Sequence, residues 1–337
     1  MTSALLELRN LSVDIETPRG KAPILRGIDL TLAAGERLGI VGESGSGKSM
    51  LALAIMGLLP GAARVQGKLM LSGEDLLAAG EDRLCALRGL RMAMVFQEPT
   101  TALNPVQTIG EQVAEGPRVH LGLGRREALE RATSLLARVG LPPERFSQRL
   151  YPHQLSGGQR QRVVIAIALA CEPDLLIADE PTTALDVTIQ KGILELLLSL
   201  AEERQMGLLM ISHDLGVIAR TTERMAVMYA GRFVEMGETA RLLSLMAHPY
   251  GRGLYRAMPQ HAPPSGRPAR ARPRLPTIPG TVPDPLAAIR GCAFANRCRH
   301  ADDDCRAQVP RLEAIAPAHY VACHHPQGHE RLTECVH

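Results

Sequence analysis

The sequence has no long hydrophobic run, almost no net charge and few aromatic residues. Its apolar stretches, such as residues 163–171, are far shorter than the ~18–20 residues that a membrane-spanning helix requires. Glu7 and Arg9 stand where a signal peptide would need apolar residues, so we expect no export. With 38 basic and 35 acidic residues, the chain gives no general reason to expect a nucleic acid or an anionic surface as partner. These absences favour a cytosolic protein.

Cysteine is scarce until the end of the chain. Only Cys85 and Cys171 precede residue 292, and a group of five then follows: Cys292, Cys298, Cys305, Cys323 and Cys335. In a reducing cytosol such a group favours a metal site over a disulfide framework. The 337 residues, 45% of them hydrophobic, exceed one modest domain and suffice for a real core. We therefore expect one large α/β unit followed by a different terminal segment.

Hydrophobic patterning predicts the organisation of that unit. Short β segments fill residues 5–41, a helix over 48–59 follows, and buried strands at 175–178 and 207–211 flank a helix at 189–203. This βαβ alternation predicts a mixed, mainly parallel sheet. Helix-like patterns between residues 105 and 150 predict an inserted helical subdomain, at about 99–157. The unit as a whole is expected to span residues 1–255.

The segment after it changes composition. Residues 259–285 hold nine prolines and, within them, Arg267, Arg270, Arg272 and Arg274. We interpret residues 256–290 as an extended linker, in preference to a basic patch for RNA or lipid, because no aromatic side chains are interleaved. Residues 291–337 then form the cysteine-rich extension.

One loop carries a complete G-x-x-x-x-G-K-S pattern. Its glycines allow backbone N–H groups to turn toward phosphates, and the helix that follows adds positive potential. Lys48 is expected to reach the β- and γ-phosphates of a nucleotide, and the Ser49 hydroxyl to bind Mg²⁺. The predicted nucleotide-binding residues are Gly42, Glu43, Ser44, Gly45, Ser46, Gly47, Lys48 and Ser49.

Adjacent acids end the buried strand at residues 175–178. Asp179 is expected in the Mg²⁺ shell, which leaves Glu180 to polarise a water molecule. A second Gly-rich helix start stands at Leu155-Ser-Gly-Gly-Gln159, with a helix beginning near Arg160. Because the chain already has one phosphate loop, this second cradle indicates a nucleotide held by another subunit.

The order of these motifs resembles the ATP-binding subunits of ABC (ATP-binding cassette) transporters, over residues 5–255. The resemblance implies a P-loop NTPase fold and a head-to-tail pair of subunits. It implies that Gln97 senses Mg²⁺ and the γ-phosphate, that Asp186 couples the two sites, and that His213 contacts the γ-phosphate. Ser156, Gly157, Gly158 and Gln159 would close on the partner's ATP. The family stacks adenine on an upstream aromatic residue, but none precedes Phe96 here; Val13 or Ile15 would have to replace it.

The cysteine spacing is x5, x6, x17 and x11, which matches neither a zinc ribbon nor a bacterial ferredoxin. From the residues alone, Zn²⁺, an iron–sulfur site and free thiols stay open, and His300, His324 or His325 could replace one cysteine at a zinc site. The stretch around Cys292 and Cys298, together with residues 97–105, 151–154 and 248–250, resembles the oligopeptide/dipeptide (and nickel) importer ATPases. That resemblance implies a [4Fe–4S] cluster on Cys292, Cys298, Cys305 and Cys323, with Zn²⁺ as the alternative and Cys335 as a free thiol.

The resulting expectation is the ATPase subunit of a di- or oligopeptide importer at the cytoplasmic face of the inner membrane. Its partners would be two permease subunits, a second ATPase subunit and, indirectly, an extracytoplasmic solute-binding protein, with no nucleic acid. Nickel or another small solute is the alternative cargo. A non-transport ABC ATPase acting on DNA or ribosomes is disfavoured by the short helical insert and the single cassette, and a catalytically silent subunit by Glu180 and His213.

Overall fold

The computed structural model describes residues 4–182, 186–258 and 277–328, and it contains two β-sheets. The smaller sheet is antiparallel and carries the first two strands of the chain, which turn back at residues 18–19. Its strands, in spatial order, are β2 (Gly20–Leu32), β1 (Leu6–Thr17), β4 (Ala63–Leu71) and β5 (Glu74–Asp75).

The larger sheet is mixed, as the sequence predicts. Five strands, from β9 to β6, are parallel, and three at one edge are antiparallel. In spatial order they are β11 (Glu313–Ala316), β12 (His319–Val321), β10 (Arg232–Glu238), β9 (Arg224–Tyr229), β3 (Arg37–Val41), β8 (Gly207–Ser212), β7 (Leu175–Asp179) and β6 (Met92–Val95).

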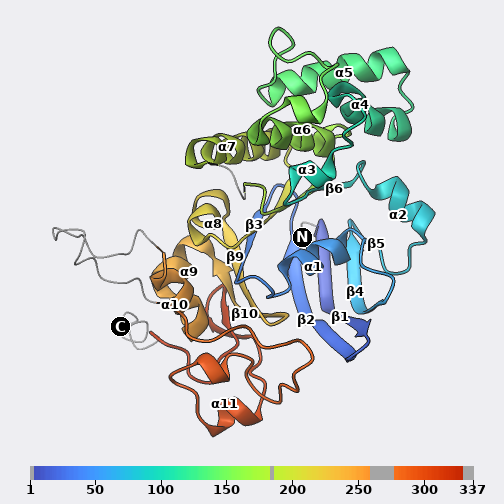
Figure 1. Ribbon diagram of the computed structural model, residues 1–337. Coiled ribbons are helices and arrows are strands. Elements are labelled where there is room, and N and C mark those ends of the chain that lie inside the picture. Colours follow the sequence, from blue (N-terminus) through green and yellow to red (C-terminus); the bar gives the residue numbers. More distant parts are fainter. Residues whose placement is uncertain (1–3, 183–185, 259–276, 329–337) are drawn as a thin grey trace, which may run out of the picture.

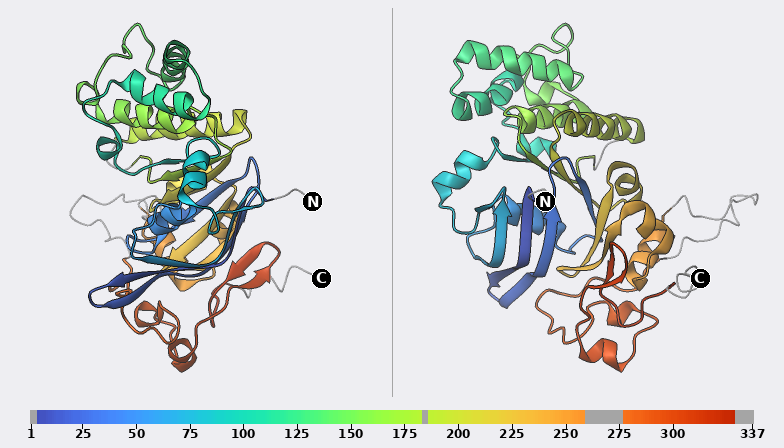
Figure 2. Two further views of the ribbon diagram at one scale, coloured as in Figure 1. Left: turned by 90° about the vertical axis from the view of Figure 1, so that its right-hand side faces the viewer. Right: turned by 180° about the vertical axis from the view of Figure 1, so that it is seen from behind.

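Helices cover this sheet and extend beyond one end of it (Figure 1). Helices α4 and α5 pack on each other and on α6 to form an outer helical layer, which Figure 2 shows from two further sides. The elements are α1 (Lys48–Ile55), α2 (Glu81–Leu87), α3 (Pro99–Ala102), α4 (Ile109–His120), α5 (Arg125–Arg138), η1 (Pro152–Gln154), α6 (Gly157–Leu169), α7 (Val187–Glu203), α8 (Leu215–Thr221), α9 (Thr239–Leu245), α10 (Pro249–Arg256), η4 (Ala295–Arg297) and α11 (Asp303–Ala307). Within the described ranges, no helix combines the length and apolarity needed to cross a bilayer.

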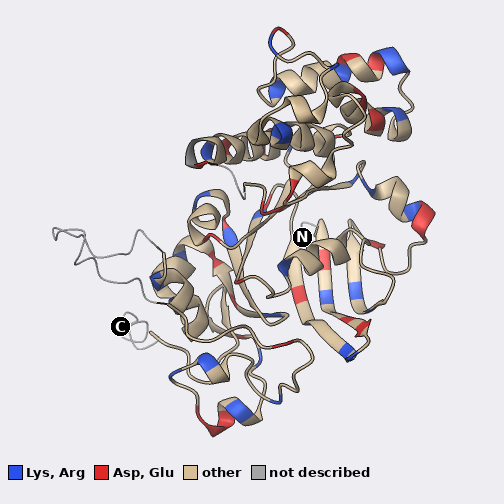
Figure 3. Cartoon of the chain, in the orientation of Figure 1, with Lys and Arg blue, Asp and Glu red and all other residues tan. Residues whose placement is uncertain are grey.

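The central strands are buried on both faces. In β7, Leu175 and Ile177 enter one core and Leu176 and Ala178 enter the other. Strands buried on both sides read as continuous apolar runs, which is why this part of the sheet could be predicted from the sequence. Lys, Arg, Asp and Glu are interspersed over the sheets and helices (Figure 3).

Two predicted helix boundaries were wrong. The first helix ends at Ile55 rather than near residue 59, because Gly57 adopts a left-handed conformation with φ +64° and such a glycine commonly ends a helix. The helix after the Leu155–Gln159 motif begins at Gly157 rather than near Arg160. Its two glycines therefore lie inside the first turn.

The terminal extension is part of the main sheet. Strand β12 pairs antiparallel with β10, with Val321 opposite Glu235. The buried Glu235 carboxylate accepts from the backbone N–H groups of Ala247 and His248 and lies 2.8 Å from His319 Nε2. The boundaries at 255, 290 and 337 stay predictions, but this pairing shows that β12, within the extension, belongs to the main sheet. Cys335 and Arg267, Arg270, Arg272 and Arg274 lie outside the described residues.

Candidate functional site

The phosphate loop connects β3 to the start of α1. Gly47, which precedes the helix, has φ +107°, and no side chain caps the first turn. At Gly42 an added Cβ would lie 2.3 Å from the carbonyl oxygen of Met228, so the backbone there passes too close for any side chain. The loop therefore leaves helix N–H groups available to an anion.

Lys48 is folded back into this loop. Its ammonium donates to the carbonyl oxygens of Gly42 at 2.7 Å and Glu43 at 3.0 Å, and the residue is 5% exposed. Burial lowers the pKa of Lys48, while the carboxylates of Glu180 and Asp179 act in the opposite direction. A cation held at this depth is costly without a counter-ion, so the site favours an anionic ligand.

A cavity of about 670 Å³ opens over the loop. Apart from the loop, its lining comes from the first turn of α1, from residues that follow three strands, and from the distant helix α10. These residues are Met50, Gln97, Glu180, His213 and Leu254. The volume suits a small-molecule ligand of nucleotide size.

Asp179 ends β7 and precedes Glu180, which lines the cavity, although Asp179 itself is not among the lining residues. The residue is 4% exposed, its Oδ1 has no hydrogen-bond partner in the described chain, and the Ser49 hydroxyl lies near enough to act on the pKa of the carboxyl. Burial raises the pKa of Asp179 against the effect of Ser49 and Lys48. An unpartnered buried carboxylate oxygen beside a hydroxyl is a donor set that Mg²⁺ accepts, so these residues fit the predicted ion.

Glu180 lies next to Asp179, in the left-handed region at φ +47°. Its amide donates to the carbonyl oxygen of Ile211 at 2.9 Å. Its Oε2 lies 3.1 Å from Nδ1 of His213 and 3.3 Å from Nε2 of Gln97. Three predicted residues, each following a different strand, thus meet at one carboxylate.

The second Gly-rich helix start lies elsewhere. Ser156 is the N-cap of α6: its hydroxyl accepts from the backbone N–H of Gln159 at 3.3 Å, while the Gln159 side chain accepts from the backbone N–H of Ser156 at 2.8 Å. Ser156 and Gly157 are exposed, and Gly158 packs against Ile189 of α7. None of these residues is among those that line the cavity over the phosphate loop.

Asp186 caps α7 by accepting from the backbone N–H of Ile189 at 2.9 Å, and residues 183–185 lie outside the described ranges.

On the adenine side of the site, Val13 is fully buried in the core, and neither it nor Ile15 lines the cavity. Leu254 of α10, which the sequence analysis missed, does line it; only the tertiary fold brings that helix to the loop.

The four described cysteines of the extension lie near one another. The N–H of Cys292 donates to the carbonyl oxygen of Cys305 at 2.7 Å. Burial raises the pKa of Cys292, and neighbouring Cys305 and Cys298 reinforce the shift. Burial also raises the pKa of Cys323 to about 12, with Cys292, Cys298 and Cys305 contributing. Burial of these thiols disfavours their negatively charged thiolate form, and a bound cation would stabilise that form.

The histidines near these cysteines have other contacts. His300 accepts from Nε of Arg299, and His324 Nε2 lies 3.0 Å from the carbonyl oxygen of Gln308. His325 differs, because its ligand atom lies within 4.8 Å of those of Asp302 and Cys305. Among the described residues this is the one group of three His, Cys, Asp or Glu side chains so close together.

Comparison with known proteins assigns the family. Residues 25–183 match the family model described as ABC transporter, and residues 234–305 match the model described as oligopeptide/dipeptide transporter, C-terminal region. A probable peptide ABC transporter ATP-binding protein of Sinorhizobium fredii is 45% identical, over 95% of this chain and 94% of its own length. The oligopeptide transport ATP-binding protein OppD of Salmonella typhimurium is 44% identical, over 96% and 94%.

Solved structures agree. The dimeric post-hydrolysis state of the ATP-binding cassette MJ0796, bound to ADP and phosphate, superposes with a TM-score of 0.62 at 29% identity, and covers 69% of this chain and 98% of that one. The predicted P-loop NTPase fold is therefore confirmed. The chain is an ATPase and belongs to the ATP-binding subunits of ABC transporters, in the group that carries the oligopeptide/dipeptide transporter C-terminal region.

Proposed function

We propose that this chain hydrolyses ATP to energise the import of di- or oligopeptides, at the cytoplasmic face of the inner membrane. The observation that carries the cargo assignment is the match of nearly the whole chain, terminal region included, to relatives whose names state peptide or oligopeptide transport. Import of nickel or another small solute by the same machinery is the alternative.

The partners follow from the same similarity. Two permease subunits supply the membrane path, a second ATPase subunit completes the pair, and an extracytoplasmic binding protein delivers the solute. The dimeric cassette among the structural neighbours supports pairing, and the exposed start of α6 supports it independently. Ser156 and Gly157 are exposed and do not line the cavity of their own chain, so they are available to a partner's nucleotide.

The nucleotide site would work through three sets of residues. Backbone N–H groups of the phosphate loop and Lys48 hold the triphosphate. Ser49, Asp179 and Gln97 would hold Mg²⁺, which when bound neutralises charge on the β- and γ-phosphates. Glu180 orients the attacking water and accepts its proton, and His213, 3.1 Å from the Glu180 carboxylate, keeps that carboxylate in place.

Substitution Glu180→Gln tests this assignment. The variant keeps the shape of the side chain but cannot accept a proton, so it should bind ATP as the wild type does and lose hydrolysis at least about a hundredfold. Turnover is measured in the assembled transporter, and ATP binding in the subunit. Glu195→Gln, an exposed acid on α7, is the matched control and should keep full turnover. Near wild-type turnover of the Glu180 variant would refute the role.

We further propose that Cys292, Cys298, Cys305 and Cys323 hold a [4Fe–4S] cluster, with Zn²⁺ as the alternative. Neighbouring sulfurs at a tetrahedral zinc ion are about 3.8 Å apart, given Zn–S bonds of about 2.3 Å. No three of these four sulfurs lie mutually within 4.8 Å in the described chain, and a cluster that binds each thiolate through a different iron spaces them more widely. Asp302, Cys305 and His325 are the residues that favour zinc.

Anaerobic purification with iron, sulfide and zinc analysis separates these two outcomes. Stoichiometric iron and sulfide, with an absorbance band that Cys298→Ser removes, would support the cluster. Zinc without sulfide would overturn it, and a Cys85→Ser variant, altered at an exposed cysteine outside the extension, provides the control.

A further inference from the structure

One side chain of the cysteine-bearing extension reaches into the phosphate loop. Arg297 ends η4, immediately before Cys298. Its Nη1 donates to Oε2 of Glu43 at 2.6 Å and its Nη2 to Oε1 at 3.0 Å. This is a bidentate ion pair between residues 254 positions apart, and the two parallel bonds fix both the orientation and the separation of the guanidinium and the carboxylate.

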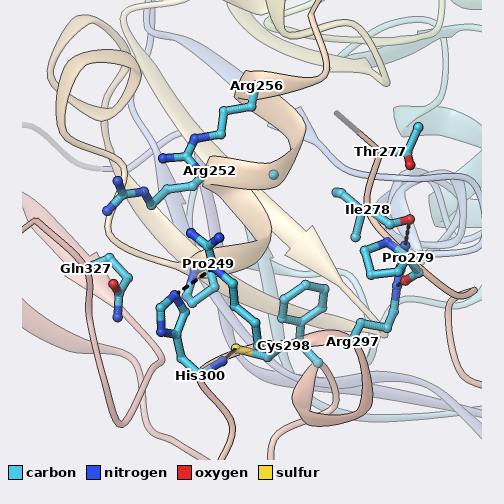
Figure 4. A pocket seen from close by; sticks show the side chains of 13 residues that line it. Pro249, Arg252, Arg256, Thr277, Ile278, Pro279, Arg297, Cys298, His300 and Gln327 are labelled. Atoms are coloured by element: carbon cyan, nitrogen blue, oxygen red, sulfur yellow. Dashed lines mark hydrogen bonds between the residues drawn. The ribbon is translucent and has the colours of Figure 1, made fainter. Parts of the chain in front are cut away.

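The remaining donors of Arg297 are also occupied. Nε donates to the carbonyl oxygen of Pro279 at 2.7 Å, and Nη1 also lies 3.3 Å from the hydroxyl of Tyr229. Figure 4 shows Arg297 between Cys298 and the segment containing Ile278 and Pro279. The Arg297 side chain is 5% exposed, and hydrogen bonding to Glu43 raises its pKa. The guanidinium is thus built into the fold as a permanent charge.

Glu43 is held at its backbone as well as at its carboxylate. Its N–H donates to the hydroxyl of Tyr250 at 2.7 Å, and its carbonyl oxygen accepts from Lys48 at 3.0 Å. Tyr250 packs with Tyr229 and Phe294, ring centroids 4.6 and 5.5 Å away. Three of the few aromatic residues of the chain therefore form the wall that joins the extension to the loop.

Charge gives this contact a function. Glu43 is the second residue of a loop that receives a polyphosphate, and an unpaired carboxylate there would repel the ligand. Arg297 neutralises that carboxylate from the side of the extension, and it holds the residue whose carbonyl oxygen orients Lys48. Because the Arg297 side chain is 5% and the Glu43 side chain 28% exposed, salt screens this ion pair less than it would an exposed one.

We propose that Arg297 is a positioning residue of the nucleotide site, which makes ATP affinity depend on the cysteine-bearing extension being seated against the phosphate loop. The inference rests on the proposed role of that loop in holding ATP. It extends the role, because the terminal region then serves ATP binding within its own subunit.

The test is a set of substitutions in the full chain, with MgATP affinity measured by titration and kcat and KM measured in the assembled transporter. Arg297→Gln should weaken ATP binding about tenfold, the loss expected for a hydrogen-bonded charge, and raise KM while kcat at saturating ATP changes less than twofold. The double variant Glu43→Gln, Arg297→Gln should recover most of the affinity, because it removes the carboxylate left unpaired. A purely structural role would leave the double variant as weak as the single one.

Arg299→Gln is the matched control, since it removes an exposed arginine two residues further along and should leave ATP affinity unchanged. Arg297→Lys keeps the charge but loses the bidentate contact, and it should weaken MgATP binding about threefold. This variant replaces Arg297→Gln in the test if Arg297→Gln gives no folded protein. Unchanged affinity in a folded Arg297 variant overturns the proposal. A wild-type chain that does not bind MgATP would instead contradict the proposed role of the loop itself.

Discussion

Two helices of this subunit begin with glycine-rich turns, yet their first turns differ in completeness. At α1 no side chain caps the helix, a buried lysine is folded into the loop, and an unpartnered carboxylate oxygen of Asp179 lies nearby. At α6 the serine and glutamine of the motif cap each other, and the turn faces solvent. The start of α1 leaves its first backbone N–H groups without a side-chain cap and open to a ligand. At the start of α6, the Ser156 and Gln159 side chains already bond to backbone N–H groups, and a ligand would have to replace those bonds.

This difference explains why one chain needs a partner. An N–H group already bonded within a capping box must exchange that bond for a ligand, which is favourable only when a strongly charged ligand arrives. We infer that α6 contributes to hydrolysis in the assembled pair and little to ATP binding by a single chain. Three predictions test this contrast.

The largest effect is expected at the first helix start. Lys48→Met should weaken MgATP binding by about a thousandfold, because a desolvated cation facing the phosphates is lost. The rise in melting temperature that MgATP produces in the wild type should disappear as well. Titration and thermal melting of the isolated subunit measure both. ATP affinity within tenfold of the wild type would show that the uncapped α1 is sufficient without its lysine.

A smaller effect, confined to the assembled pair, is expected at the second helix start. Ser156→Ala should lower ATP turnover about a hundredfold, the loss typical of one preorganised donor to a developing negative charge. ATP binding by the single subunit should stay within twofold of the wild type.

Thr108→Ala is a suitable control for this variant. Thr108 caps α4 in the same helical layer by accepting from the N–H of Glu111, so both variants lose a cap worth about 1 kcal/mol. Only the Ser156 variant should lose turnover. Equal losses in the two variants would mean that Ser156 acts through helix stability alone.

The smallest effect concerns packing behind α6. An added Cβ at Gly158 would lie 2.6 Å from Cγ2 of Ile189, so Gly158→Ala should lower the free energy of unfolding by about 1–2 kcal/mol as α6 and α7 separate slightly. Chemical denaturation measures it. Gly61→Ala, where an added Cβ meets nothing within 4 Å, should cost less than half as much. A Gly158→Ala variant with an unchanged free energy of unfolding would show that the contact between α6 and α7 can adjust without cost.

The nucleotide site was more predictable than its surroundings. Residues 42–49 and the acids after β7 are local patterns with a fixed geometry, and the carboxyl ends of neighbouring parallel strands must lie at one edge of the sheet. The meeting of Gln97, Glu180 and His213 follows from that rule. The end of α1 was missed because a left-handed Gly57, rather than the end of the apolar pattern, terminates the helix.

The surroundings depend on contacts between distant residues, which leave no local pattern. Nothing in the sequence around Arg297 indicates Glu43, and nothing around Leu254 indicates a cavity over the phosphate loop. The pairing of β12 with β10 was hidden for a similar reason, since the strand His319–Val321 has three residues and is too short to show alternation.

The sequence by itself determined which residues could carry the chemistry of this protein: a phosphate loop, two adjacent acids that we propose for Mg²⁺ and for a general base, a second glycine-rich helix start, and thiols grouped near the end of the chain. These depend on residue types at short spacings, which physical chemistry constrains directly. The tertiary structure decided how the parts are joined. Packing against a shared sheet placed the cysteine-bearing extension against the phosphate loop and buried the Arg297 side chain between them. The sequence could not indicate this contact, because the free energy of such an ion pair depends on surroundings that only the folded chain assembles.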